Sequence, residues 1–592
     1  MHVRASASGH TYIGTGPTPS YTTHGDRNEG KMKTLIKKLL TATMVTCLAF
    51  SALVTPTPAA KAAGTQMKLY GIYLKANKGQ EAYAKSQNEY GDAVILESKG
   101  NYLLMDTGAF YTSDSLLDAI GKMGITELDL YISHLHPDHF ESIYDLIEKG
   151  IRINRLYLPD RSLGADWVSE GGGTTDGMYR KIESWFKYMG NGANSDVQTV
   201  YLKKGSTFTV GDVSAKVIGP VGTYDMAECN NYFPADVYGE RSGHYLNNYS
   251  LTTMFTCGSV KFLTTGDIES IENQQGSAYK GTAIKKLEEE CLVETYAGEL
   301  KADILKMAHH GLNSSSSAAF LDAVDPRIAF AESTGYQDLA DVPGKKIPKY
   351  YSPVERMHEH GITIMNGHEK AGVGITVNND NISVYIDKNN DTKLTDSEKL
   401  SGWINVSGIA NKTGTDFTGD DVYYIDPNEA DFKPATGIQK IGKKNYIFTK
   451  GGALERAFYK GSSYLGWRTY GSKYRYFSKP DSMGRADMAV GFKKIGANYF
   501  YFDKNGYRYA PSKGDSNSKG KLWKLKKIGK YYYLIKKGNG AVFNMGKSRN
   551  SFMPFNGGKK LRAFDKKGRM LTGSAKVNGK TYKFDKKTGF KK

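Results

Sequence analysis

Between Met67 and Ile386, short apolar runs alternate with longer segments in which apolar residues recur at helical spacing. The runs at 93–98 and 128–133 predict buried strands, and the apolar stripe within 113–123 predicts an amphipathic helix. Further strands are expected at 102–106, 214–219, 251–256, 260–264, 328–331, 373–377 and 382–386. This mixture favours a layered α/β fold over a sandwich made of strands alone.

A second pattern begins near Asp420, where the sequence becomes self-similar. An apolar residue, a Gly-containing turn and a run of aromatic residues recur at 441–448, 470–477, 495–502, 528–534 and 577–584. Each copy has the length of one β-hairpin, and its aromatic side chains need the next copy for burial. The pattern therefore predicts a solenoid-like array of hairpins.

Residues 32–62 have the pattern of a cleaved secretory signal peptide. A basic start is followed by an apolar stretch from Leu39 to Val54 and by small residues near Ala60. The apolar stretch is short and interrupted by Thr, so no transmembrane span is expected in the mature chain. The polar residues 1–31 precede a better start at Met32 and are interpreted as a leader of doubtful status.

The net charge of +19 divides sharply along the chain. Residues 63–433 hold 34 Lys and Arg against 52 Asp and Glu, which is −18, whereas residues 434–592 hold 39 against 7, which is +32. The basic excess predicts that the repeats bind a polyanion, such as an anionic cell-wall polymer of the teichoic acid type. Nucleic acid, and a merely solvated basic surface, are the alternatives left open.

The chemistry begins where the expected strand 128–133 ends, at His134-Leu135-His136-Pro137-Asp138-His139. Side chains at i and i+2 beyond a strand point the same way, so His134 and His136 can hold one cation. Asp138 and His139 lie on the turn into the next helical run, expected from Phe140 to Glu148, and can face a neighbouring cation. Capping of that helix would explain Asp138 but none of the histidines.

Two later strand ends add to this set. The strand 260–264 ends in Gly266-Asp267, and a carboxylate there can bridge two cations. The run from Asp303 ends in His309-His310-Gly311. Adjacent residues do not easily ligate one ion together, so one histidine is expected as a ligand and the other in the cleft.

With these motifs the chain resembles the metallo-β-lactamase fold superfamily over about residues 66–386. The motifs that carry the resemblance are Gly91-Asp92-Ala93, Met105-Asp106-Thr107-Gly108, His134 to His139, Thr265-Gly266-Asp267 and Lys306 to Gly311. It looks closest to the branch that holds the competence DNA-uptake hydrolase domain and the surface phosphorylcholine esterases, because Asn247-Asn248-Tyr249-Ser250 precedes the Gly-Asp strand. The resemblance implies a four-layer αββα sandwich with two zinc ions at the strand ends.

Carried over by position, the resemblance assigns roles to individual residues. His134 and His136 would hold the first zinc. Many members of the superfamily have a further histidine ligand in the region of Asn247-Asn248, and His244 is the alternative that could substitute for it here. The second zinc would be held by Asp138, His139 and His310, with Asp267 bridging both ions. Asp106 would orient a metal ligand, and His309 would protonate the leaving group or bind a phosphoryl oxygen. Asn248 would donate a hydrogen bond to the phosphoryl group, although a turn-forming role explains Asn248 equally well.

The C-terminal repeats resemble, in degenerate form, the cell-wall- or choline-binding repeats of bacterial surface proteins. Those modules cage choline with tryptophans, yet only Trp467 and Trp523 fall within this region, which counts against choline. The linker segment 387–398 places oxygen ligands as in a calcium loop, but Thr392 stands where the turn wants Gly, so a plain polar linker is favoured.

Together these features predict a secreted, wall-associated, zinc-dependent phosphodiesterase that acts on an envelope phosphoester. The expected domains are the leader 1–31, the signal peptide 32–62, the hydrolase 63–386, the linker 387–432 and the repeats 433–592. An extracellular nuclease is the alternative within the same class. A non-catalytic surface-binding protein is the alternative of another class.

Overall fold

In the computed structural model, the described residues are 65–87, 91–167, 173–189, 192, 194–224, 243–271, 286–312, 314–331, 356–357, 360–366, 371–387, 389–406, 421–455, 466–482, 484–516 and 521–592. The expected leader and signal peptide lie outside these ranges. Within them, no helix has both the length and the apolar character needed to cross a membrane.

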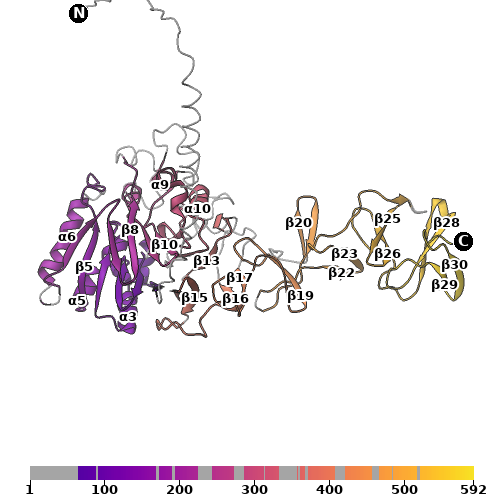
Figure 1. Ribbon diagram of the computed structural model, residues 1–592, viewed down its shortest axis with the longest axis horizontal. Coiled ribbons are helices and arrows are strands. Elements are labelled where there is room, and N and C mark those ends of the chain that lie inside the picture. The colour runs from indigo at the N-terminus through magenta and orange to yellow at the C-terminus, as the bar shows by residue number, and fades with distance from the viewer. Residues whose placement is uncertain are drawn as a thin grey trace, which may run out of the picture. The chain divides into compact units, whose positions relative to one another are not determined.

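Two mixed sheets form the N-terminal part of the structure (Figure 1). The first has the order β15-β14-β1-β2-β3-β4-β5-β6 and the second the order β13-β12-β11-β10-β9-β8-β7. The first sheet consists of β1 (Gln66–Gly71), β2 (Val94–Ser98), β3 (Asn101–Met105), β4 (Glu127–Tyr131), β5 (Arg152–Pro159), β6 (Gln198–Leu202), β14 (Gly372–Asn378) and β15 (Asn381–Asp387). The second consists of β7 (Thr207–Val210), β8 (Val213–Gly219), β9 (Thr252–Cys257), β10 (Val260–Thr264), β11 (Ile304–Lys306), β12 (Ile328–Ala331) and β13 (Thr363–Asn366).

Three buried apolar layers show how the sheets and helices are stacked. Leu103 packs in the layer between the two sheets with Phe255 and Phe330, whereas its neighbour Leu104 packs with the helices on the outer face of the first sheet. This two-residue alternation is what a strand buried on both faces requires. The third layer joins the outer face of the second sheet, through Leu305, to its own helices.

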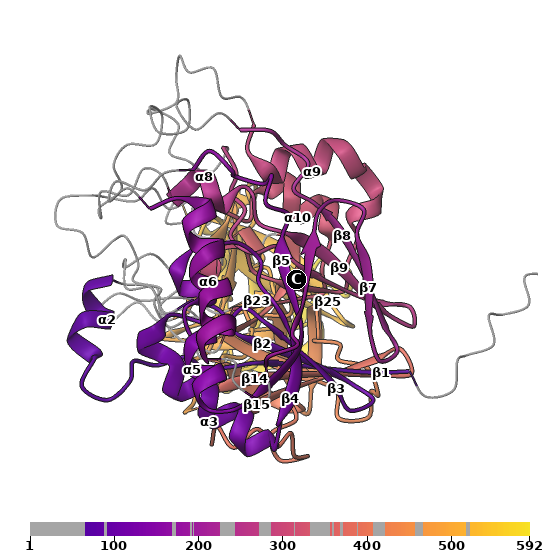
Figure 2. The ribbon, with the colours of Figure 1, turned by 90° about the vertical axis from the view of Figure 1, so that its left-hand side faces the viewer.

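The helices cover both outer faces, which gives the order helix, sheet, sheet, helix. One side has α3 (Ser113–Met123), α5 (Ile143–Glu148) and α6 (Thr175–Met189), and the other has α9 (Glu288–Tyr296) and α10 (Ala318–Val324). Figure 2 shows these two groups of helices on opposite sides of the strands. The four-layer αββα sandwich predicted from the sequence is therefore confirmed.

Local differences from the sequence prediction lie in the helices. The helical run expected from Phe140 to Glu148 is two short helices, α4 (Pro137–Phe140) and α5, and α4 begins early enough to include Asp138 and His139. α6 lies in a segment in which no helix was predicted from the sequence. The remaining short helical elements are α2 (Glu81–Gln87), α8 (Gly243–Asn247), η1 (Phe110–Thr112), η2 (Ala297–Leu300) and η3 (His309–Gly311).

Antiparallel hairpins make up the described C-terminal part (Figure 1), as predicted. They are β16 (Gly402–Val406) with β17 (Asp421–Ile425), β18 (Gly437–Ile441) with β19 (Lys444–Phe448), β20 (Trp467–Tyr470) with β21 (Lys473–Tyr476), β22 (Gly491–Ile495) with β23 (Asn498–Phe502), β24 (Asp515–Ser516) and β25 (Leu522–Ile528) with β26 (Tyr531–Lys536), β27 (Ser551–Phe555) with β28 (Lys560–Phe564), and β29 (Gly573–Val577) with β30 (Lys580–Phe584).

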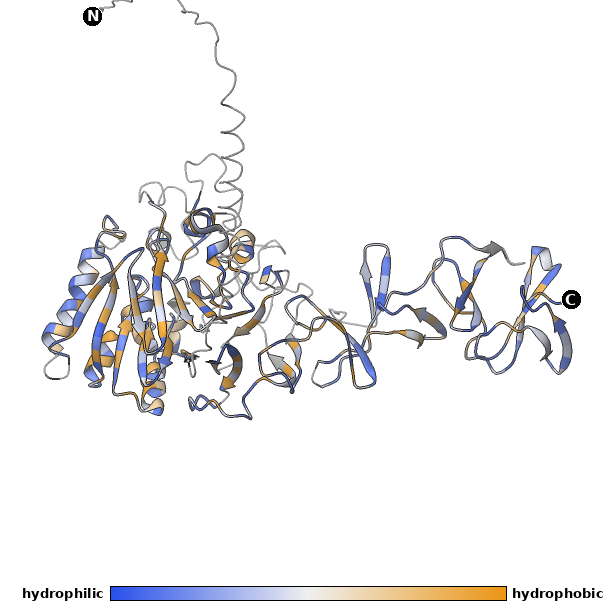
Figure 3. Ribbon diagram, in the orientation of Figure 1, coloured by the Kyte–Doolittle hydropathy of each residue, from blue (hydrophilic) through white to orange (hydrophobic). Residues whose placement is uncertain are grey.

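The recurring glycine of the template has a conformational reason. Gly442 and Gly496 open two-residue hairpin turns at φ 60° and 56°, in the left-handed region that hairpin turns require. The pair β27 and β28 was not predicted, because η7 (Asn556–Gly558) replaces that turn. Figure 3 shows hydrophobic residues recurring along the strands of the sandwich and more hydrophilic residues along the hairpins.

The predicted linker contributes to the core of the sandwich. Tyr423, Ile425 and Phe432 are buried in the same apolar layer as Phe262 of β10 and Val384 of β15. Backbone hydrogen bonds support this packing, since the Phe432 N–H donates to the Ile382 carbonyl at 2.7 Å. The expected limits at 387–432 remain a prediction, but the described part of this segment packs as a structured extension of the sandwich.

Candidate metal centre

The predicted ligands collect where several strands end at one edge of the sandwich. His134 and His136 follow β4, Asp267 follows β10, and His310 follows β11 in η3. β3 and β4 are parallel, as are β10 and β11, so the carboxyl ends of each pair meet at the same edge. This topology brings together residues that are more than 170 positions apart in the sequence.

Asp92, His139, Asp267 and His310 form a buried cluster whose donor atoms all lie within 4.8 Å of one another. The Nε2 atoms of His139 and His310 each lie 3.1 Å from Oδ2 of Asp267. Asp138 joins the group, with Oδ2 at 3.1 Å from His310 Nε2 and 3.6 Å from His139 Nε2. The imidazoles of His139 and His310 therefore converge with the carboxylates of Asp267 and Asp138 on a common point.

The two remaining histidines adjoin this cluster. The ring centroid of His134 lies 4.6 Å from that of His136 and 4.2 Å from that of His139. His134 is buried, and its Nδ1 lies 3.1 Å from Ser133 Oγ, which leaves Nε2 as the atom available to a ligand. The structure thus brings together all six residues that the sequence predicts as metal ligands, while their role in holding metal remains a prediction.

Buried atoms without partners at this centre test whether a cation fits. Among the described residues, four such atoms have no hydrogen-bond partner: Nε2 of His134, Oδ1 of Asp267, Oδ1 of Asp92 and Nδ1 of His310. Buried polar atoms are rarely left without partners, because each costs about 1–3 kcal/mol. Imidazole nitrogens and carboxylate oxygens are ligands that Zn²⁺ accepts, so the residues present fit a divalent metal.

The electrostatics divide the histidines into two kinds. Burial lowers the pKa of His136 to about 4 and lowers that of His134 well below its ordinary value, so both are neutral at pH 7, the form that binds metal. Burial also opposes charge on His139 and His310, but the carboxylates around them, above all Asp267, hold both pKa values well above the ordinary value.

The carboxylates show the complementary effect. Burial would raise the pKa of Asp267 and Asp138, but the adjacent imidazoles of His139 and His310 hold both well below their usual range. Both carboxylates are therefore ionised at neutral pH. A site of this kind concentrates negative charge that only protons or a metal cation can balance.

The predicted orienting residue Asp106 lies directly behind the centre. Its Oδ2 lies 2.9 Å from Nδ1 of His139, and it accepts hydrogen bonds at 2.7 Å from both the backbone N–H and the hydroxyl of Ser133. With Nδ1 of His139 bound in this way, Nε2 faces the cluster. These contacts are those that an orienting carboxylate needs, although the role itself remains a prediction.

Asp92 and Lys306 were not assigned a role from the sequence. The two side chains form a buried ion pair, and the other oxygen of Asp92 lies 3.1 Å from Nδ1 of His310. Asp92 therefore faces His310 through an ionic contact, whereas Asp106 is hydrogen-bonded to His139. Its motif contained the only available signal: Gly91 has φ +77°, and a Cβ there would lie 1.7 Å from the Asp138 carbonyl oxygen, so the two loops meet only because Gly91 has no side chain.

His309 lies beside the centre, and its ring is largely buried. Nδ1 is 2.7 Å from Ser314 Oγ and 3.2 Å from Glu269 Oε1, and Nε2 is 3.4 Å from the side-chain amide of Asn247. Asn247 is thus a neighbour of His309, and no role was predicted for Asn247 from the sequence. The predicted catalytic role of His309 remains a prediction.

Asn248 has contacts of a different kind. Its side-chain oxygen accepts the backbone N–H groups of Glu269 at 3.2 Å and Glu288 at 3.1 Å, and the side chain is fully buried. These contacts favour the structural role, in which Asn248 joins two loops behind the site. Its predicted substrate contact remains a prediction, and the side chain of His244 lies outside the described residues.

A second group of carboxylates lies in the segment interpreted as a calcium-like loop. Oxygens of Asp387, Asp391 and Glu398 lie within 4.8 Å of one another. Asp387 is already engaged, since it accepts hydrogen bonds from Tyr70 Oη at 2.6 Å and from the Thr392 backbone at 2.7 Å. The calcium site at 387–398 therefore remains a prediction.

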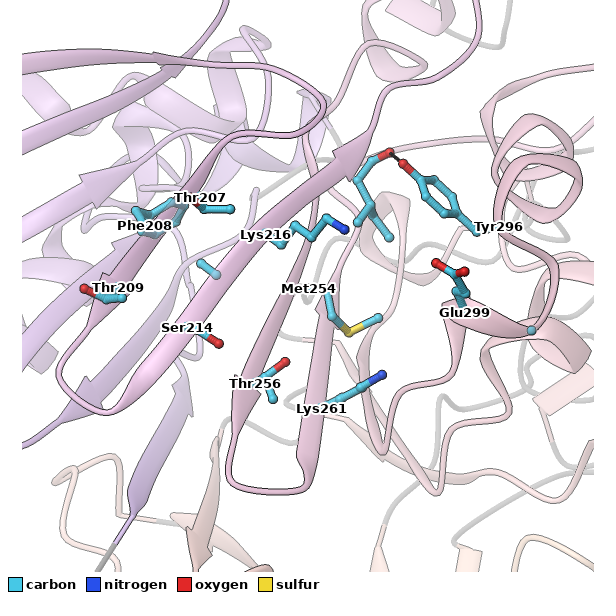
Figure 4. Close-up of a pocket in the computed structure, with 13 residues that line it drawn as sticks. Thr207, Phe208, Thr209, Ser214, Lys216, Met254, Thr256, Lys261, Tyr296 and Glu299 are labelled. Atoms are coloured by element: carbon cyan, nitrogen blue, oxygen red, sulfur yellow. Dashed lines mark hydrogen bonds between the residues drawn. The ribbon is translucent and has the colours of Figure 1, made fainter. Parts of the chain in front are cut away.

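An open hollow of about 830 Å³ lies on the outer face of the second sheet and includes none of the predicted site residues. Figure 4 shows Lys216, Met254 and Lys261 on the strands, with Tyr296 and Glu299 on the other side of the hollow. Its position separates it from the strand ends that carry the Asp/His cluster.

No protein-family model matches the chain. A stretch of 119 residues, 20% of the chain, is 33% identical to "Competence protein ComA" of Neisseria gonorrhoeae, and this match spans 14% of that protein's length. Among solved structures, the chain is similar to the metallo-beta-lactamase fold protein YhfI of Bacillus subtilis (13% identity, 45% of this chain and 86% of that chain, TM-score 0.25). It is also similar to choline binding protein F of Streptococcus pneumoniae (21% identity, 36% of this chain and 56% of that chain, TM-score 0.20).

Proposed function

We propose that the protein is a secreted, zinc-dependent hydrolase that acts on a phosphodiester of the cell envelope and is held at the wall by its C-terminal repeats. The observation that carries the hydrolase is the buried convergence of His139, His310 and Asp267, with unpartnered atoms on Asp267 and His134. Burying this many ionisable groups is costly unless a cation balances them. A cluster that serves only stability would gain more from apolar residues.

The residues fit a two-metal arrangement. His134 and His136 would hold one ion, Asp138, His139 and His310 the other, and Asp267 would contact both. Bound metal would supply a water of lowered pKa and would neutralise charge on the phosphoryl oxygens. Asp106 would keep the imidazole of His139 turned towards the centre through its hydrogen bond to Nδ1, and Asp92 would act on His310 through its charge.

The chain's own acid would be His309. Its Nδ1 atom is bound to Ser314 and lies close to Glu269, so Nε2, which lies 3.4 Å from the amide nitrogen of Asn247, would be the atom that exchanges a proton with the leaving oxygen. The nearby amide of Asn247 limits rotation of the ring. His309 therefore has the position of a general acid held by neighbours that do not ligate metal.

Attachment to the wall is supported by the charge of the repeats. Residues 434–592 hold 39 basic and 7 acidic side chains, whereas the sandwich is acidic. An anionic polymer such as teichoic acid would attract the repeats and would be repelled by the body of the enzyme. The signal peptide proposed at 32–62 would bring the protein to the compartment where such polymers occur.

A nuclease that acts on extracellular DNA is the second candidate. The observation that favours it is the match to a protein named for competence, which covers 20% of the chain. DNA and teichoic acid are both phosphodiester polymers, so the same metal centre suits both substrates.

An activity panel tests the proposal. Purified protein is given teichoic acid, phosphorylcholine esters, DNA and bis-p-nitrophenyl phosphate, each with and without a chelator and zinc repletion. We expect metal-dependent cleavage of an envelope phosphoester, abolished by Asp267→Ala but retained by Asp325→Ala, an exposed carboxylate paired with Lys301. Faster cleavage of DNA than of any envelope polymer would favour the nuclease, and equal activity in Asp267→Ala would reject the site.

A further inference from the structure

Three successive hairpins of the repeats surround a hollow of about 650 Å³, a volume within the usual range for small-ligand sites. We call it the Arg508 pocket. Its aromatic lining residues are Tyr474, Tyr501, Tyr507 and Tyr509, and its basic ones are Lys473, Arg508, Lys526 and Lys537. The single acidic residue in its lining is Asp503.

The aromatic faces beside this pocket are already occupied by cations of the chain itself. The guanidinium carbon of Arg508 lies 4.5 Å from the ring centroid of Tyr474 and 5.1 Å from that of Trp467. Lys473 and Lys526 cover Tyr507 and Tyr509 at 4.9 and 4.8 Å. A ligand ammonium group would have to displace these side chains to reach the same rings.

Arg508 differs from the arginine stacked in the neighbouring hairpin. Arg475 lies 4.3 Å from the rings of both Tyr470 and Tyr507, and Glu455 balances its charge at 3.7 Å. Within the described residues, no carboxylate is paired with Arg508, and its buried Nε has no hydrogen-bond partner. Its Nη2 donates to the Gly538 carbonyl at 3.3 Å, which leaves the guanidinium with unused donors.

The one acidic side chain of the pocket does not balance this charge. Asp503 Oδ1 accepts the backbone N–H groups of Asn505 and Tyr507, each at 2.9 Å, and so belongs to the turn after β23. The pocket therefore presents a guanidinium and lysine ammonium groups beside tyrosine rings. Guanidinium groups bind phosphate oxygens through two N–H donors, and tyrosine rings pack against the C–H faces of polyols and sugars.

We propose that the Arg508 pocket binds a phosphate group, and the adjoining polyol, of a phosphodiester-linked wall polymer, and that it excludes quaternary ammonium ligands because Arg508 fills the aromatic site. This inference rests on the proposed attachment to the wall and gives that attachment a location. The ligand class is thus the opposite in charge to the choline bound by the modules that these repeats resemble.

The test compares charge reversals inside and outside the pocket in the full-length protein. Lys473→Glu/Lys537→Glu changes two exposed lining residues, and Lys440→Glu/Lys586→Glu makes the same change in net charge at exposed positions elsewhere in the repeats. Binding to immobilised poly(glycerol phosphate) lipoteichoic acid is measured at several salt concentrations, with circular dichroism as the check on folding. We expect the pocket variant to bind about tenfold or more weakly, and the control variant within about threefold of the parent.

Further measurements separate the possible outcomes. Arg508→Lys keeps the charge but loses the forked donors, so it should also weaken binding to the polymer. Choline chloride should elute the parent protein from the polymer no better than sodium chloride of equal ionic strength. Equal loss in both double variants, or specific elution by choline, would overturn the pocket while leaving wall attachment intact. Tighter pocket-dependent binding of DNA would overturn the polyol polymer as occupant. Failure of the parent to bind the polymer at all would overturn the attachment itself.

Discussion

The buried pair Asp92 and Lys306 offers a quantitative test of how the metal centre is built. Both side chains are almost completely inaccessible, at 1% and 2% exposure, and the Asp92 carboxylate lies between the Lys306 ammonium and Nδ1 of His310. Lys306→Met leaves the carboxylate buried without the ammonium group that is paired with it. Removal of one partner of a buried pair costs about 3–5 kcal/mol of unfolding free energy.

The double variant gives the sharper result. Asp92→Asn/Lys306→Met removes both charges, so its loss of stability should be smaller than the sum of the two single losses by about 2 kcal/mol. Lys301→Met is the matched control, because the Lys301–Asp325 pair is exposed and should contribute less than about 1 kcal/mol. Urea unfolding of chelator-treated protein, followed by circular dichroism, measures all five proteins.

The same variants test the link to the metal. Asp92→Asn removes the negative charge that lies 3.1 Å from Nδ1 of His310, so zinc affinity should fall about 10–100-fold in this variant. Competition with a chromophoric chelator measures this affinity. Additive losses of stability, together with unchanged zinc affinity in Asp92→Asn, would refute the arrangement described for Asp92.

Two further predictions concern stability. Burial raises the pKa of Glu289 to about 7 from 4.5, although the N–H groups of Ser316 and Ser317 favour its charged form. The free energy of unfolding of the parent should therefore fall by up to about 3 kcal/mol as pH rises from about 4.5 through 7. The melting temperature of the parent should therefore fall relative to that of Glu289→Gln between pH 5 and pH 8. Melting temperatures that change with pH by the same amount in both proteins would contradict the assignment. A fragment of residues 63–386 should melt at least about 10 °C below one of residues 63–455, because only the longer one keeps the buried residues of β17 in the core, and equal melting temperatures would show that the extension is dispensable.

Much of the fold could be predicted because its signals are local. Strands buried on both faces produce continuous apolar runs, and the hairpins repeat one short template with glycine at the turn. Two features were not predictable in this way. The helix α4 is a single turn, and the helical pattern that continues to Glu148 does not show where α4 ends. The buried contacts of Tyr423 and Phe432 with the sandwich depend on tertiary packing, which no local sequence pattern predicts.

The candidate site divides along the same line. The residues from His134 to His139 carry their own signal, since three imidazoles within six positions are rare in a chain with 12 histidines. Asp92 and Lys306 are separated by 214 positions, and their contact becomes visible only when β2 and β11 are placed in their sheets. Asn248 shows that two roles can fit one residue in sequence: its side-chain oxygen joins two backbone segments, while its substrate contact remains a prediction.

The metal content of the purified full-length protein tests the central claim most directly. Protein prepared without chelator and analysed by inductively coupled plasma mass spectrometry should contain about two zinc ions per chain. His134→Ala should lower this content, and Asp267→Ala should lower it further because Asp267 contacts both proposed positions. A parent protein that contains no metal, and that takes up none from micromolar zinc at neutral pH, would contradict the account.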